Sequence, residues 1–259
     1  LSTGSASADR AGDLTFSVGN SGGFAGDISI ESGDSLSSVG SNVHVRAGSS
    51  VEGIGGSINL QTGAGTSGVS GALRLKTAAG RQFSSGGLEL RSGNAETAGA
   101  SGDVRITTGA SIVQNSGEIE LRAGAAASGS GGQVVLAAGH GVTGAGGNVD
   151  IFSGSGEQGA SGHVFVRTAS SSLETGSIEI ETAAVEEGSS GDVTVSTGAS
   201  TTDSSGSIEI SGGKQLGNSG TVGITSGSST AARGGDVVLR SGAGASSGGN
   251  IKIQTGGKS

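Results

Sequence analysis

The chain has 259 residues with 56 Gly and a net charge of −8, and it lacks Pro, Cys, Met, Trp and Tyr. The absence of Cys excludes disulfides and thiolate metal sites. No run of about 18 apolar residues is present, so we expect no membrane insertion, and the acidic balance argues against nucleic acid as a partner.

A repeat of 14 to 16 residues, most often 15, runs from end to end of the sequence. The consensus of the unit is Gly, polar, aliphatic, any, aliphatic, any, Thr/Ser/Ala, Gly/Ala, followed by about seven small residues. Positions three and five are Val, Ile, Leu or Phe in all 17 units. A Gly/Ser-rich composition alone is typical of disorder, but a disordered segment does not keep such a register. In chain order the units begin at Gly12, Gly26, Ser41, Gly56, Gly71, Gly86, Gly102, Gly117, Gly132, Gly147, Gly162, Gly176, Gly191, Gly206, Gly220, Gly235 and Gly249.

Extended strands are the predicted elements, because the apolar residues of each unit are two apart and never three or four apart. Each strand covers about seven residues and ends in a Gly/Ser/Ala turn. The constant short period leaves no room for helices between strands. We therefore predict an all-β fold, a parallel β-solenoid with equivalent strands about 4.8 Å apart. It forms one continuous array over residues 1–259, with a partial unit before the 17 complete ones.

Position four distinguishes alternate units, so the real period is two units. The units that begin at Gly26, Gly56 and every second one thereafter are the acidic set, and the remaining units are the basic set. In the acidic set position four holds Ser29, Asn59, Glu89, Glu120, Asp150, Glu179, Glu209 and Val238. In the basic set it holds Thr15, His44, Arg74, Arg105, Val135, Phe165, Thr194, Gly223 and Lys252.

Two coil geometries fit this alternation. With two units per coil, four aliphatic residues meet across a flattened core, and each extra buried side chain adds roughly 1.5–3 kcal/mol. With one unit per coil, Glu89 and Glu120 alternate with Arg74 and Arg105 in a ladder. That arrangement avoids repulsion of roughly 1 kcal/mol per neighbouring acid pair. We favour two units per coil. The sequence begins part-way through a predicted strand and ends in register, so we expect uncapped ends that promote head-to-tail association.

The stretches GDVTVSTGAS and GGNIKIQTGG resemble the Gly/Ser-rich β-solenoid repeats of long extracellular proteins. Such repeats occur in bacterial adhesin and filament stalks and in algal, notably diatom-type, surface proteins. The resemblance covers the whole chain, and it implies a fibre or surface role in an extracellular or cell-surface location.

Two charged surfaces are the first candidate sites. The acidic column consists of Glu89, Glu120, Asp150, Glu179 and Glu209, and the basic face of Arg46, Arg74, Lys76, Arg105 and Arg167. One interpretation of the column is a solvated face, partly neutralised by Arg91 and Arg122. The other is a ladder that takes up Ca²⁺ or docks on the basic face of a neighbouring solenoid. We expect no other cofactor. The Asp residues that directly follow Gly do not fit a calcium β-roll.

Apolar residues interrupt the polar pattern in the middle of the chain. Val135, Phe152 and Phe165 stand at outward positions, where they are either tolerated drift or a lateral contact between solenoids. We expect the apolar turn residues to plug the corners of the coil. They are Leu36, Val51, Ile54, Phe83, Ile112, Val142, Leu173 and Leu216.

The sequence predicts a structural protein rather than an enzyme, because His44, His140 and His163 do not converge and no long loop forms a cleft. We expect a rod or filament built by rung stacking, with self-association head to tail or laterally. The alternative is an adhesin stalk or surface-binding module for ions, glycans or ice. Outward Thr is too scattered for a regular ice-binding array.

Overall fold

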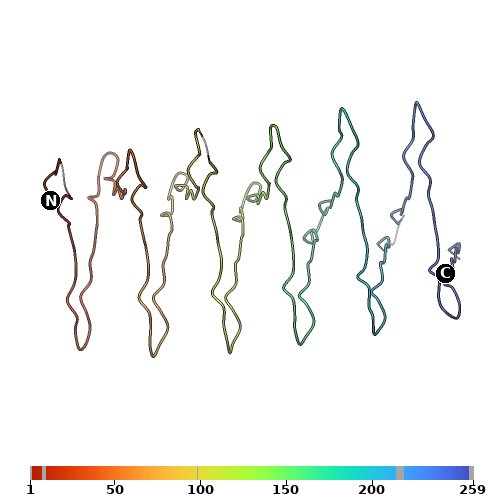
Figure 1. The fold of residues 1–259 in the computed structure, drawn as a ribbon, viewed down its shortest axis with the longest axis horizontal. Coiled ribbons are helices and arrows are strands. Elements are labelled where there is room, and N and C mark those ends of the chain that lie inside the picture. Colours follow the sequence, from red (N-terminus) through yellow and green to blue (C-terminus); the bar gives the residue numbers. More distant parts are fainter. Residues whose placement is uncertain (1, 8–9, 98, 214–218, 257–259) are drawn as a thin grey trace. The chain divides into compact units, whose positions relative to one another are not determined.

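The structure is a computed structural model that describes residues 2–7, 10–97, 99–213 and 219–256. In these ranges the backbone forms no helix and no strand, and extended stretches alternate with sharp bends (Figure 1). The chain divides into two units, Leu1–Val134 and Val135–Ser259. Both units contain the same sequence repeat and the same succession of stretches and bends.

The predicted parallel β-solenoid is wrong for this part of the chain. A strand needs a neighbour about 4.8 Å away with which to exchange backbone hydrogen bonds. In the ranges that the structure describes, the backbone hydrogen bonds lie at the turns instead. Neither the 15-residue nor the 30-residue coil is formed in residues 2–7, 10–97, 99–213 and 219–256. The alternating apolar pattern sets an extended conformation, but it leaves the pairing of that conformation open.

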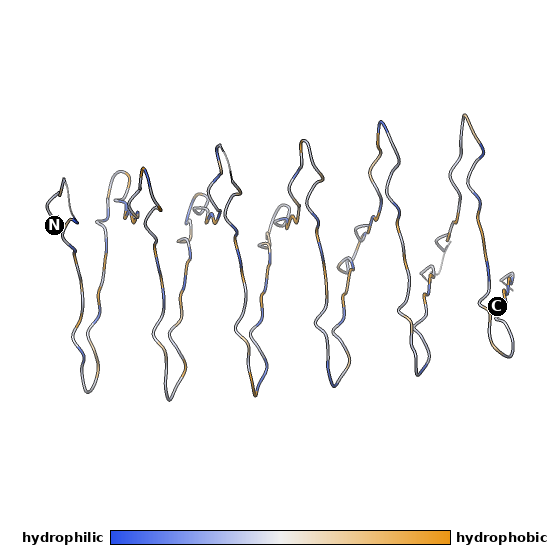
Figure 2. Cartoon of the chain, viewed as in Figure 1, coloured by the Kyte–Doolittle hydropathy of each residue, from blue (hydrophilic) through white to orange (hydrophobic). Residues whose placement is uncertain are grey.

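The predicted core is exposed to solvent. Side chains at position three are 50–60% exposed and those at position five 57–86% exposed. Val135, predicted to point outward, and Leu136, predicted to point inward, are both 68% exposed. The accessible surface is 26329 Å², whereas a compact protein of this mass exposes about 10,000 Å². Figure 2 shows apolar residues spread along all the extended stretches rather than gathered in one place.

The apolar turn residues do not plug corners either. Seven of the eight that we expected to do so are 88–105% exposed, namely Leu36, Val51, Ile54, Phe83, Ile112, Val142 and Leu173. Leu216 lies outside the described residues. A corner plug requires a coil interior, and no such interior forms in the described ranges.

A recurring hydrogen bond closes the turns between units. The N–H at position one of a unit donates to the carbonyl oxygen at position eight of the preceding unit. Gly56 N to Gly48 O and Gly147 N to Gly139 O are both 2.9 Å long. The same bond joins Ser41 to Gly33, Gly71 to Gly63, Gly132 to Gly124, Gly162 to Gly154, Gly235 to Gly227 and Gly249 to Gly242. The two ends of each of these turns are therefore held together locally.

At several units the close approach across this turn explains the glycine at position one. A Cβ on Gly132 would lie 3.1 Å from the Cβ of Ala123, and one on Gly71 would lie 3.3 Å from the Cβ of Thr62. Ala123 and Thr62 each occupy position seven of the preceding unit. A side chain at position one of these two units would therefore crowd the residue that enters the turn. Ser41 occupies position one where the closing bond is longer, at 3.3 Å.

Position ten, at the tip of the turn, is occupied in three ways. In the first, a Ser hydroxyl accepts a hydrogen bond from an N–H two or three residues later, which is a serine turn. Ser50 accepts from Gly53 at 2.9 Å and Ser200 from Asp203 at 3.0 Å. The other serines of this kind are Ser21, Ser35, Ser111, Ser171 and Ser229.

In the second kind of turn, position ten is a glycine with no space for a side chain. A Cβ on Gly141 would lie 2.5 Å from the carbonyl oxygens of Gly144 and Ala145. The later half of the turn folds directly over this α-carbon, so only Gly is accommodated. The same crowding occurs at Gly65, Gly80, Gly156 and Gly244.

In the third kind, position ten is Ala95, Ala126 or Val185. These residues have no hydroxyl to accept a hydrogen bond, and unlike glycine they carry a side chain. These three turns contain the positive-φ glycines Gly99, Gly129 and Gly188, with φ of 97°, 116° and 107°. Each lies three residues before the next unit, in the left-handed region that other residues rarely adopt. The turn of the unit that begins at Gly206 falls partly outside the described residues.

Candidate functional site

The acidic column makes local contacts only. Glu89 forms an ion pair with Arg91 at 3.2 Å, and Glu120 forms one with Arg122. Both pairs join residues two apart on one extended segment, as the alternating pattern predicts. All four side chains are exposed, so each pair contributes about 0–1 kcal/mol.

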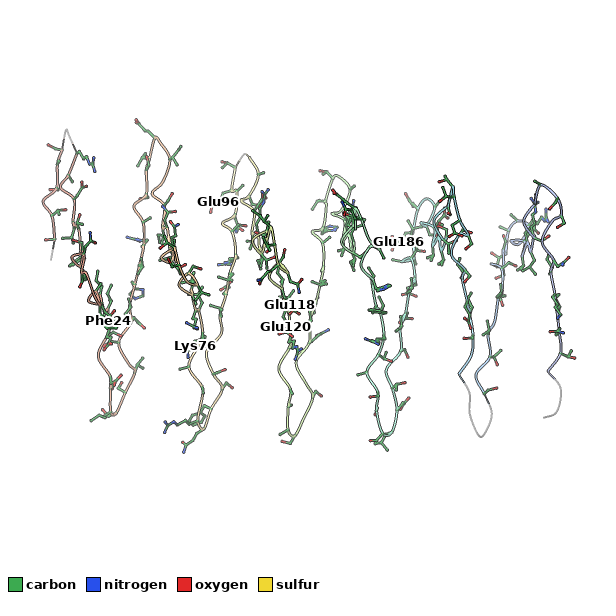
Figure 3. All side chains as sticks on the ribbon, turned by 90° about the horizontal axis from the view of Figure 1, so that it is seen from below. Phe24, Lys76, Glu96, Glu118, Glu120 and Glu186 are labelled. Atoms are coloured by element: carbon green, nitrogen blue, oxygen red, sulfur yellow. The ribbon has the colours of Figure 1, made fainter. Side chains whose placement is uncertain are left out.

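The structure does not bring the acidic column together. Its members come from separate units, and no three or more His, Asp or Glu side chains within the described ranges form a group that could hold a metal ion. Figure 3 shows Glu118 and Glu120 next to each other on one segment, and Lys76 on another. In this arrangement the carboxylates meet solvent singly or in neighbouring pairs, without the multiple oxygen ligands that Ca²⁺ requires.

The basic face is likewise distributed over separate segments. Arg105 pairs with Asp103 at 2.8 Å on its own segment. Arg46 lines a shallow, open hollow with residues 47–49. Arg74 and Lys76 have no ion-pair partner within the described part of the chain. Exposed guanidinium and ammonium groups are thus available to an anionic partner from outside the chain.

The candidate lateral contact contains one side-chain cluster. The rings of His163 and Phe165 lie 5.6 Å apart, and the guanidinium of Arg167 lies 5.3 Å from the centroid of Phe165. These residues are two apart, so they share one side of an extended segment. At an exposed site such a cation–π contact contributes about 0.5–1 kcal/mol. Val135 and Phe152 are exposed on other segments.

Two ion pairs at the start of a unit were not predicted from the sequence. Arg10 pairs with Asp13 at 2.9 Å, and Arg233 pairs with Asp236 at 2.7 Å. In both cases Arg lies two residues before position one and Asp occupies position two. The recurrence of Arg-x-Gly-Asp in the sequence is the pattern that could have found them.

Comparison with protein-family models, with curated proteins and with solved structures returned no match. Among the described residues, no helix is long and apolar enough to cross a membrane.

Proposed function

We propose that the protein is a non-catalytic structural protein that forms fibres by association of its own copies, outside the cell or at its surface. The observation that carries this proposal is the exposure of a regular apolar pair, at positions three and five, on every unit. Apolar side chains that are exposed at regular intervals leave water when copies associate, and this burial favours association.

The exposed area is large enough to hold an assembly together. The chain exposes about 16,000 Å² more than a compact protein of its mass. A specific interface buries about 1,200–2,000 Å² in total, so the association of a few units already reaches this size. The repeat distributes that surface evenly along the chain, which suits a fibre better than a single docking patch.

The unpaired backbone supports the same function. Extended segments with free N–H and C=O groups are templates for pairing with another chain. Each segment in the described ranges combines such a backbone with an apolar pair. Association would therefore satisfy hydrogen bonds and bury apolar surface in one step.

Sedimentation velocity over a hundredfold range of concentration, followed by electron microscopy of the same samples, tests this function. We expect slowly sedimenting single chains at low concentration and elongated assemblies above a threshold. A chain that stays monomeric throughout would contradict the proposal. If that monomer bound Ca²⁺ in calorimetry, or was retained on an immobilised glycan, the protein would instead be a surface-binding module.

A further inference from the structure

We propose that copies of this chain associate with units of the acidic set of one copy facing units of the basic set of the next. In a parallel arrangement, neighbouring copies are then offset by an odd number of units, the smallest offset being one unit of about 15 residues. This inference rests on the proposed function and specifies both the partner and the register.

A second copy of the chain fits the exposed surface because its apolar pairs have the same spacing. The apolar pairs recur at an interval of 14 to 16 residues along the whole chain. A partner with another spacing would lose alignment within a few units, whereas an identical chain offset by whole units stays aligned to within two residues, because the units differ in length by no more than two. The uniform exposure of positions three and five means that no single unit is a preferred docking point.

Charge at position four decides between the possible offsets. With no offset, Glu89 faces its own counterpart, and so does every other member of the acidic column. With an offset of two units, Glu89 faces Glu120. With an offset of one unit, Glu89 faces Arg74 or Arg105 and Glu120 can face Arg105. Opposite charges directly across paired segments are favourable, and like charges are unfavourable.

The side chains involved are available for these contacts. Arg74 has no ion-pair partner within the described ranges. Glu89, Glu120 and Arg105 already have partners two residues away, but all of these side chains are largely exposed. A carboxylate accepts more than one donor, so an external Arg can be added without loss of the local one.

The offset also explains how association would continue into a fibre. In an offset pair the two copies contribute different units to each contact, so each copy can repeat the same contact with a third copy. A contact of this head-to-tail type does not close on itself and generates an open filament. A pair without offset would instead cover both copies over their full length.

Charge exchange between two variants tests the register. The first variant carries R74E and R105E, and the second carries E89R and E120R. The matched control carries R81E and R233E, which make the same change of charge as the first variant but at turn residues. Full-length chains are compared by pelleting and electron microscopy at low salt, where surface charge is least screened.

We expect each charge variant alone to need at least about a tenfold higher concentration than the unaltered chain to assemble. An equimolar mixture of the two should assemble at close to the original concentration and contain both chains, and the turn control should behave like the unaltered chain. If R74E/R105E assembles as readily as the unaltered chain, or the mixture fails to recover, the register is wrong while self-association stands. If the unaltered chain does not assemble, the proposed function itself fails.

Discussion

Single residues determine how each unit ends. At position ten, some units have a serine whose hydroxyl accepts a hydrogen bond from a backbone N–H, and others have a glycine whose α-carbon lies close to carbonyl oxygens. In the remaining described turns, a glycine with positive φ lies later in the same turn. These are three solutions to one steric problem, because the chain must bend sharply within seven residues. The sequence shows that these turns are rich in Gly and Ser, but not which glycines are irreplaceable. That distinction depends on the positions of carbonyl groups three or four residues later.

The turn at Gly141 gives a direct test at this scale. We expect Gly141→Ala to open the turn and weaken the bond from Gly147 N–H to Gly139 O, at a cost on the order of 1–3 kcal/mol. Gly144→Ala in the same turn is the control, because a Cβ there meets nothing within 4 Å. Amide exchange at Gly147, measured by nuclear magnetic resonance, should accelerate only in the first variant. Equal rates in both variants would argue against the crowding.

The extended segment is the element of this protein, and the strand predicted in its place is wrong for the described residues. The spacing of two between apolar residues predicts an extended backbone, and the stretches between the bends are extended (Figure 1). It also predicted a stacked strand, which is absent from the described ranges. Extension is encoded by neighbouring residues, whereas pairing needs a choice of partner. Near-identical units offer many equivalent partners, so the repeat specifies register weakly.

Likewise, the only contacts of the candidate site that the sequence predicted correctly are those between residues close together in the chain. The ion pairs of Glu89 with Arg91 and of Glu120 with Arg122 are present, because residues two apart share one side of an extended segment. The cation ladder is not assembled, because it needed residues about 30 apart to meet. The same limit applies to the corner residues, since Leu36 and its counterparts needed a coil interior, which does not form among the described residues.

Substituting one segment tests whether the apolar pair serves association rather than the single chain. We expect Ile119→Ser with Leu121→Ser to leave the dispersed chain unchanged, because both side chains are already exposed. The concentration needed for assembly should rise more than tenfold, since each side chain is worth roughly 1.5–3 kcal/mol when buried. Ile112→Ser is the control, an equally apolar but fully exposed turn residue. A similar effect of all these changes on pelleting would count against a segment-specific contact.

At the scale of the whole molecule, the exposed area distinguishes this protein from a compact domain. A surface of 26329 Å² is about two and a half times that of a compact protein of the same mass. Such a surface leaves little hydrophobic stabilisation within one copy. The two units Leu1–Val134 and Val135–Ser259 share this property, because no buried hydrophobic residue occurs in the described part of either.

Hydrogen exchange on the whole chain should therefore distinguish the dispersed chain from the proposed assembly. We expect amides of the extended segments to exchange rapidly in the dispersed chain and to become strongly protected on assembly, as intermolecular pairing engages them. The amides at position one, already bonded across the turn, should change less. Mass-spectrometric exchange at two concentrations measures both. Segment amides that are already protected in dilute solution would contradict the structure described here.

The closing bond of the turns has a consequence for kinetics. Each such bond spans seven or eight residues, and loops of about ten residues close in about 10–100 ns. All turns can thus form in parallel, without a slow nucleus and with a time nearly independent of chain length. In the proposed association, the slow event is the collision of two chains that have already formed their turns. The lag before fibre growth should accordingly follow protein concentration rather than the number of repeats.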